Sequence, residues 1–82
     1  MYNCRISTHK CDITGISDYK SDLKQFNSYL EARRYLDKLY KDFQKDHGYT
    51  RILDSTCMRI RMRAEDSENE AFIFFDGELE EV

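Results

Sequence analysis

The sequence has no proline, no tryptophan and only three glycines among its 82 residues. It has no apolar run close to the ~20 residues that a membrane-spanning helix needs, and its N-terminus lacks the apolar segment of a signal peptide. No repeat, linker or low-complexity tract divides the chain. We therefore expect a single domain over residues 1–82 that lies in the cytoplasm, without contact to a membrane.

Cysteine and histidine are also scarce. Cys4, Cys11 and Cys57 are an odd number without CxxC spacing, which argues against a disulfide framework. A zinc set of these thiols with His9 would require the fold to bring all four together, and thiols packed in or near strands are the plainer interpretation. No hydrolase, metalloprotease or phosphate-binding-loop motif is present. We expect a non-enzyme with no metal and no cofactor.

Aromatic residues are abundant by contrast. Five Phe and six Tyr compensate for an apolar content of 40% and predict a folded core. The net charge of −3 is unevenly distributed: residues 1–63 hold 13 bases and 8 acids, a net of +5, whereas residues 64–82 hold 8 acids and no base. Such an asymmetry is typical of an interaction surface.

The strongest local pattern is a helix between Ser28 and Gly48. Ser28 and Glu31 form a capping box, no Gly or Pro interrupts the stretch, and Gly48 can end it in the left-handed conformation. The helical period gathers an apolar stripe that has to be buried against another element. Its members are Tyr29, Ala32, Leu36, Leu39, Tyr40 and Phe43, with Tyr35 at the edge.

Before this helix, alternating apolar residues over 1–8 predict a strand. Residues 9–17 contain a Thr-Gly pair and predict a turn or short loop. Residues 18–26 fit either a helix or a strand, and we prefer a strand that leads into the capped helix.

After the helix, residues 49–53 begin an extended segment, and residues 56–63 show the clearest two-residue period of the chain. The apolar run 71–75 is typical of a central strand that is covered on both faces or meets a partner. Asp76-Gly77 is a hairpin signal, so residues 78–82 would return as a short edge strand.

These elements predict an α+β fold. A β-hairpin, one long helix and a β-meander would form a small antiparallel sheet, with the helix packed on one face. The helix stripe would cover Met58, Ile60 and Met62 together with one face of residues 71–75.

Two basic surfaces could contact nucleic acid. Arginines on one face of the 56–63 strand could bind phosphates, with nearby aromatic rings stacking on bases; cross-strand pairing with acids is the interpretation we favour for them. A basic stripe on the helix is interrupted by acids and fits an ordinary solvated face. The strand set is Arg59, Arg61 and Arg63, and the helix set is Arg34, Lys38, Lys41 and Lys45.

The C-terminal acids are the third candidate. Their concentrated negative charge would steer the protein toward a basic groove on a partner, although solubility and neutralisation of the arginine strand also explain it. Three phenylalanines of the 71–75 strand could anchor such a partner. The acidic set is Glu65, Asp66, Glu68, Glu70, Asp76, Glu78, Glu80 and Glu81, and the anchors are Phe72, Phe74 and Phe75.

The capped helix SYLEARRYLDKLYKDF, the acidic C-terminal stretch DSENEAFIFFDGELEEV and the short chain resemble small accessory proteins of phages and mobile elements, including anti-CRISPR and related anti-defence inhibitors. The resemblance covers the whole chain in overall style and carries over no functional residue. It implies a stoichiometric binder, often dimeric, that blocks a nucleic-acid-handling complex in the cytoplasm of the host cell.

We therefore expect an inhibitor that docks its acidic surface on a larger host protein with a basic groove. A homodimer that buries the outer face of residues 71–75 stays open. The alternative is a small nucleic-acid-binding or regulatory module that uses the arginine strand, or a protein that sequesters nucleotides.

Overall fold

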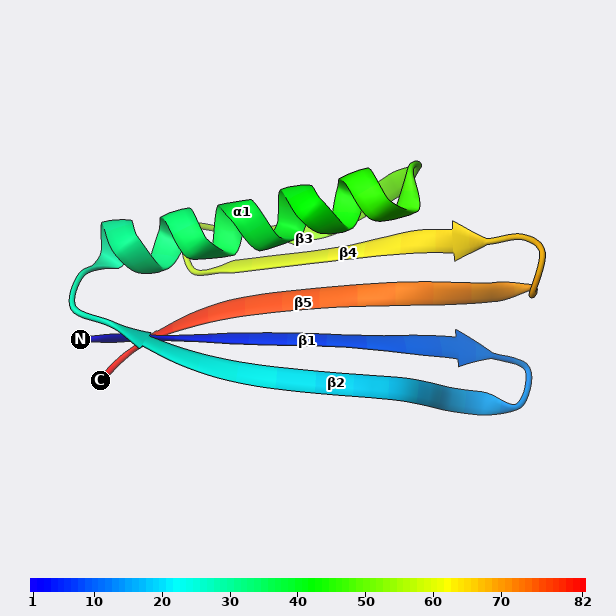
Figure 1. Ribbon diagram of the computed structural model, residues 1–82, viewed down its shortest axis with the longest axis horizontal. Helices are drawn as coiled ribbons and strands as arrows, with labels where there is room; N and C mark the ends of the chain where they lie inside the picture. The colour runs from blue at the N-terminus through cyan, green and yellow to red at the C-terminus, as the bar shows by residue number, and fades with distance from the viewer.

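The computed structural model describes residues 1–82 as a five-stranded antiparallel sheet with one helix packed against it (Figure 1). The sheet order is β2-β1-β5-β4-β3. The predicted N-terminal hairpin, the helix and the antiparallel meander after it are confirmed, as is the strand preferred for residues 18–26. The elements are β1 (Tyr2–Asp12), β2 (Gly15–Phe26), α1 (Tyr29–His47), β3 (Thr50–Ser55), β4 (Arg59–Asp66) and β5 (Ala71–Glu81).

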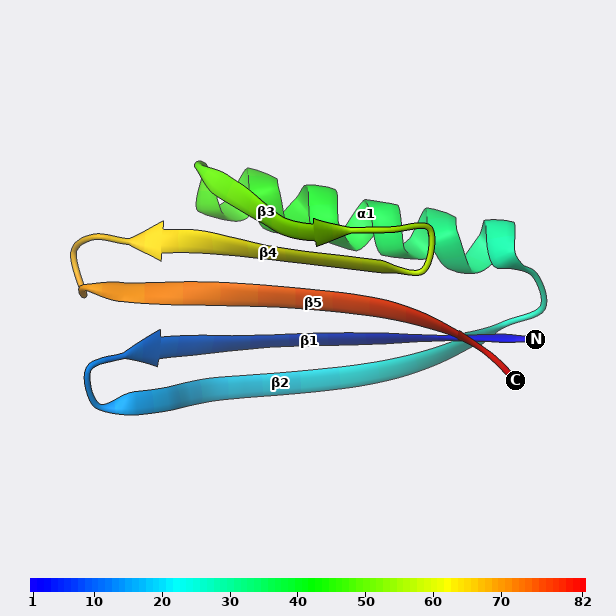
Figure 2. The ribbon, with the colours of Figure 1, turned by 180° about the vertical axis from the view of Figure 1, so that it is seen from behind.

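The pairing of β1 with β5 joins the N-terminal hairpin to the C-terminal meander. It runs without interruption from Tyr2 opposite Glu81 to Cys11 opposite Phe72. Both chain ends therefore lie at the same end of the sheet, as Figures 1 and 2 show, and the Val82 N–H donates to the Met1 carbonyl at 2.9 Å. As a result β5 is the central strand of the sheet.

The predicted start at Ser28 and end at Gly48 are confirmed, although Gly48, with ψ at −109°, does not take the left-handed helical conformation expected for it. Ser28 Oγ accepts from the Glu31 N–H at 3.3 Å, and Gly48, with φ at 72°, donates its N–H to the Gln44 carbonyl at 3.0 Å. Each bond satisfies a backbone group that the helix itself leaves unpaired. The helix lacks the length of apolar sequence that a membrane crossing requires.

The core lies between α1 and the three middle strands. Side chains of β1, β4 and β5 alternate toward the helix, which meets them with its predicted stripe. The edge strands contribute little, since eleven of the twelve residues of β2 are exposed. The buried cluster consists of Cys4, Ile60, Met62, Ala64, Phe75 and Leu79 from the sheet and Ala32, Leu36 and Phe43 from the helix.

The predicted hairpin at Asp76-Gly77 is wrong. Both residues lie inside β5, which continues to Glu81 without a turn, so residues 78–82 do not form a separate edge strand. The lack of a side chain at Gly77 allows close packing, because a Cβ at this position would overlap the buried Leu36 side chain. The glycine lets the helix approach the central strand, and it does not adopt a positive φ.

The predicted loop over residues 9–17 is also wrong over most of its length. β1 continues to Asp12 and β2 begins at Gly15, which leaves only a two-residue turn. The Asp12 carboxylate closes this turn by accepting from the Thr14 N–H and hydroxyl at 2.8 and 2.5 Å. These hydrogen bonds lower the pKa of Asp12.

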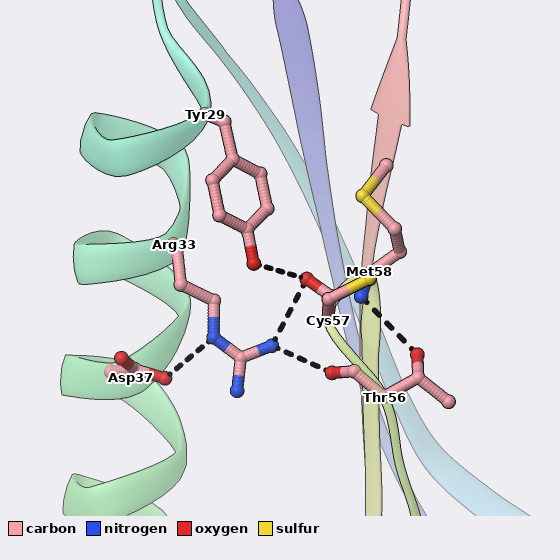
Figure 3. Close-up of polar contacts among 6 residues, drawn as sticks. All are labelled: Tyr29, Arg33, Asp37, Thr56, Cys57 and Met58. Carbon is pink, nitrogen blue, oxygen red and sulfur yellow. Dashed lines mark hydrogen bonds and ion pairs between the residues drawn. The ribbon is translucent and has the colours of Figure 1, made fainter.

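Polar contacts tie the first turns of α1 to the β3–β4 turn (Figure 3). The Tyr29 hydroxyl donates to the Cys57 carbonyl at 2.6 Å, and Arg33 Nη1 donates to the Thr56 and Cys57 carbonyls at 2.9 and 3.3 Å. Arg33 also pairs with Asp37 at 3.0 Å. These bonds hold the β3–β4 turn beside the helix.

Replacing Gly77 by alanine should lower the free energy of unfolding by about 1–3 kcal/mol, because the new methyl group displaces the buried Leu36 side chain. Leu36→Ala should lower it by about 2–5 kcal/mol. The double variant should lose less than the two changes together, since the methyl group then enters the space that Leu36 leaves. Urea unfolding followed by circular dichroism measures all three, and strict additivity would contradict the contact.

Candidate functional site

The sheet has one face under α1 and one face that no helix covers, which we call the helix-free face. Because side chains alternate along a strand, the β4 arginines and several β5 acids share this face. Arg59 stands opposite Glu78, and Arg61 stands opposite Asp76. The register of β4 on β5 therefore decides which arginines meet an acid.

Two of the three strand arginines are paired with Asp76. Arg59 Nε and Nη2 donate to its two carboxylate oxygens at 3.1 and 2.8 Å, and Arg61 Nε lies 4.0 Å from the same carboxylate. These hydrogen bonds raise the pKa of Arg59. The cross-strand pairing favoured from the sequence is thus present for Arg59 and Arg61.

Farther along the helix-free face, one row of side chains crosses all five strands. Tyr19 of β2 and His9 of β1 stack with ring centroids 6.4 Å apart, and His9 stacks on Phe74 of β5 at 4.9 Å and 14°. Phe74 stands directly opposite Arg63 of β4, which stands opposite Arg51 of β3. The row therefore consists of three rings followed by two guanidinium groups.

Phe72 adds a fourth ring beside this row. Its centroid lies 6.4 Å from that of Phe74, and the Arg63 guanidinium lies 4.5 Å from the Phe72 ring in a cation–π contact. Phe72 is 38% exposed and Tyr19 is 66% exposed, so both can reach a ligand. We call the full set the aromatic–arginine patch: His9, Tyr19, Arg51, Arg63, Phe72 and Phe74.

Arg51 and Arg63 have no acidic partner. Neither belongs to any of the four ion pairs of the chain, and the buried Nε of Arg63 has no hydrogen-bond acceptor. Like charges directly opposite each other on neighbouring strands are unfavourable. An anion between the two guanidiniums would relieve this repulsion and accept hydrogen bonds from both.

A bulge lies at the β2 end of the patch. The register between β1 and β2 shifts between Thr8 and Lys10, and Asp18 is the additional residue, with a positive φ of 52°. Tyr19, next to the bulge, stacks beside His9.

Sequence reasoning considered His9 only as a zinc ligand and did not single out Tyr19 or Arg51 as site residues. His9 fell within a stretch that the Thr-Gly pair marked as a loop, although alternation along residues 2–12 places it on the same face as Arg5. No local pattern indicates that β1 pairs with β5 or that β3 continues the row.

The predicted acidic surface is divided. One part is exposed around the β4–β5 turn, and a second lies on the helix-free face among the arginines. Glu68 and Glu70 lie in the turn, Glu65 lies near the end of β4 opposite Phe72, and Asp76, Glu78 and Glu80 lie in β5. Asp66 pairs with Lys10 at 3.5 Å, and Glu81 stands opposite Tyr2.

The remaining predicted contacts are also separated. Phe75, expected as an anchor, is 3% exposed and packs on Phe43 in the core. Phe72 and Phe74 lie on the helix-free face. The helix bases are exposed on α1, away from the sheet, and do not form one surface with the strand arginines; they are Arg34, Lys38, Lys41 and Lys45.

The three thiols and His9 do not come together. Cys4 lies in the core under the helix, Cys11 lies on the helix-free face opposite Phe72 of β5, and Cys57 lies in the β3–β4 turn. No group of three or more His, Cys, Asp or Glu side chains could hold a metal ion. Burial, with a smaller contribution from Asp22, raises the pKa of the Cys4 thiol to about 11.

Comparison of the chain with protein-family models, with curated proteins and with solved structures finds no match.

Iodoacetamide at about pH 8 should modify Cys57 first and leave Cys4 unmodified in the folded protein. Cys57 is exposed, whereas Cys4 is 1% exposed and its thiol pKa of about 11 keeps it protonated. Peptide mapping by mass spectrometry after timed reaction measures the order, and unfolding with urea should make both react. Equal rates in the folded protein would contradict the burial of Cys4.

Proposed function

We propose that the protein is a small non-catalytic module that binds single-stranded nucleic acid on its helix-free face. The observation that carries this proposal is the row of three stacked rings and two unpaired arginines. Aromatic rings on a sheet stack with unpaired bases of any sequence, and guanidinium groups bind phosphates through paired hydrogen bonds. The patch holds both kinds of group side by side.

The geometry favours a single strand over a duplex. Neighbouring strands lie about 4.8 Å apart, so the row from Tyr19 to Arg51 extends roughly 19 Å across the sheet. A strand laid along this row would bring bases to the rings and phosphates to Arg51 and Arg63. A duplex keeps its bases stacked inside and offers the rings nothing to stack on.

The net charge of −3 limits the affinity without preventing binding. Asp76 is neutralised by two arginines, Glu68 and Glu70 lie in the turn outside the row, and Glu65, opposite Phe72, is the carboxylate nearest the patch. If the two arginines of the row, Arg51 and Arg63, neutralise phosphates, the logarithm of the binding constant should fall with the logarithm of salt with a slope of about −1.4. Stacking would then supply most of the binding free energy.

A second candidate is the inhibitor that the resemblance implies. What supports it is the end of β4 with the β4–β5 turn, which extends past the C-terminal end of α1 (Figure 1) and exposes three carboxylates of the predicted acidic surface. These are Glu65, Glu68 and Glu70. A basic groove on a nucleic-acid-handling protein could accept this turn.

Fluorescence anisotropy with a short labelled single-stranded RNA or DNA tests the proposal. Tyr19→Ala and Phe72→Ala should each weaken binding by about 5- to 100-fold, the loss expected for one base-stacking ring. Arg63→Ala should weaken binding and reduce the salt slope by about half. The matched controls are Tyr49→Ala and Arg34→Ala, which remove exposed residues of the same types outside the patch.

Three results would contradict this function: no binding, equal losses in patch and control variants, or tighter binding to a duplex. Competition by a free mononucleotide as strong as that by the oligonucleotide, with the same dependence on Phe72, would instead identify nucleotide sequestration. Both outcomes are read from the same titration.

If the protein is such an inhibitor, binding of its partner should depend on the exposed acids and not on the aromatic–arginine patch. Tagged protein should retain a stoichiometric partner from a nuclease-treated lysate, and combined reversal of Glu65, Glu68 and Glu70 to lysine should abolish retention because the partner's groove is basic. Reversal of Lys41 and Lys45 to glutamate on α1 is the control for altered charge. Retention that survives reversal of the turn acids would rule out this surface.

A further inference from the structure

β2 is a long edge strand with one free side. Its only neighbour is β1, it contains no proline, and eleven of its twelve residues are exposed. Its large side chains Ile16, Tyr19 and Leu23 are 68%, 66% and 52% exposed. A free edge of this length offers a row of unpaired backbone groups to another strand. Something that pairs with β2 would satisfy them and cover its apolar side chains.

The charges of β2 alternate in sign along one face. Lys20, Asp22 and Lys24 follow one another at alternate positions and stand opposite Thr8, Ile6 and Cys4 of β1, which places them on the helix side of the sheet. An edge with charges of a single sign would repel a second copy of itself. A ladder of alternating sign attracts a second copy in every register that sets lysine opposite aspartate.

We propose that the protein forms a symmetric homodimer by antiparallel pairing of β2 with β2 of a second copy, with the two-fold axis at Ser21. In this register Lys20 stands opposite Asp22 of the second copy, and Tyr19 stands opposite Leu23 of the second copy. Two-fold symmetry makes each of these pairs twice. The contact thus combines two pairs of opposite charge on one face with two apolar pairs on the other.

Other registers fit less well. With the two-fold axis at Lys20 or at Asp22, that residue would stand opposite the same residue of the second copy, so like charges would meet. Centring on Leu23 also pairs Asp22 with Lys24, but it sets Lys20 opposite Phe26 and moves Tyr19 beyond the end of the strand. Centring on Tyr19 meets the bulge at Asp18.

The backbone of β2 is suited to the same register. The Leu23 N–H donates to the Asp22 carboxylate at 2.9 Å in an exposed hydrogen bond, so this N–H points out of the sheet. In an antiparallel ladder the outward-pointing groups belong to alternate residues, which here are Tyr19, Ser21 and Leu23. Pairing about Ser21 sets these residues opposite one another, and Lys20 of the second copy takes over the Asp22 carboxylate.

This dimer depends on the edge of β2 alone and stands independently of nucleic-acid binding. It also differs from the homodimer considered from the sequence, which would bury the outer face of residues 71–75, because it uses the free edge of β2 and not a face of the central strand β5. Pairing of the edges would join two helix-free faces into one continuous surface. The two copies of Tyr19 would lie on that surface about 14 Å apart along the strands.

Sedimentation equilibrium over a range of protein concentrations tests the dimer. Lys20→Asp and Asp22→Lys should each raise the dimer Kd by about ten-fold or more, because each sets like charges opposite one another twice. The double variant, which exchanges the two charges, should restore the Kd of the natural chain. Lys41→Asp, the same charge change at an exposed site on α1, should leave the Kd unchanged.

Amide hydrogen exchange supplies a second readout that needs no variant. The Ser21 and Leu23 amides should exchange slowly at concentrations where the dimer forms and quickly on dilution. A natural chain that stays monomeric, a dimer insensitive to either single change, or a double variant that fails to restore pairing would overturn the proposal. A dimer abolished by Phe72→Ser but not by the charge changes would overturn it as well, in favour of the helix-free face.

Discussion

The packing of Leu36 against the bare backbone of Gly77 determines where everything else lies. Gly77 occupies the middle of the central strand, and only a residue without a Cβ leaves room for the Leu36 side chain there. With the helix seated at this point, its apolar stripe covers the middle strands and leaves the far side of the sheet open. The helix-free face follows from that contact, whereas the free edge of β2 follows from the strand order, in which β2 is the outermost strand.

The helix and the order of elements could be predicted because their signals are local. The cap at Ser28, the ending at Gly48 and the stripe between them are properties of one continuous segment. The path of β5 could not be predicted in the same way. Asp76-Gly77 favours a turn by its own preferences, but pairing with β1 and the approach of Leu36 outweigh that preference.

For the same reason, only part of the candidate site could be predicted. The sequence identified Arg59, Arg61 and Arg63 as one set and favoured pairing with acids for all three. The register of β4 on β5 pairs the first two with Asp76 and places Phe74, not an acid, opposite Arg63. His9 joins Arg63 on one surface only through contacts between segments far apart in the chain, which no local pattern records.

The two surfaces discussed here have different chemistry. The aromatic–arginine patch lies across the sheet and offers rings beside unpaired positive charge, as an unstacked, charged polymer requires. The free side of β2 offers backbone groups and alternating charges, as another strand requires. Tyr19 belongs to both, so a dimer at β2 would set two patches on one continuous face.

The most direct test of the central claim is an NMR titration of the protein with a short single-stranded oligonucleotide, followed through the backbone amide signals. Binding at the helix-free face should shift the signals of His9, Phe74 and Arg63 most strongly and leave the exposed side of α1 unchanged. Shifts confined to the β4–β5 turn or to α1, or no shifts at all, would contradict the account.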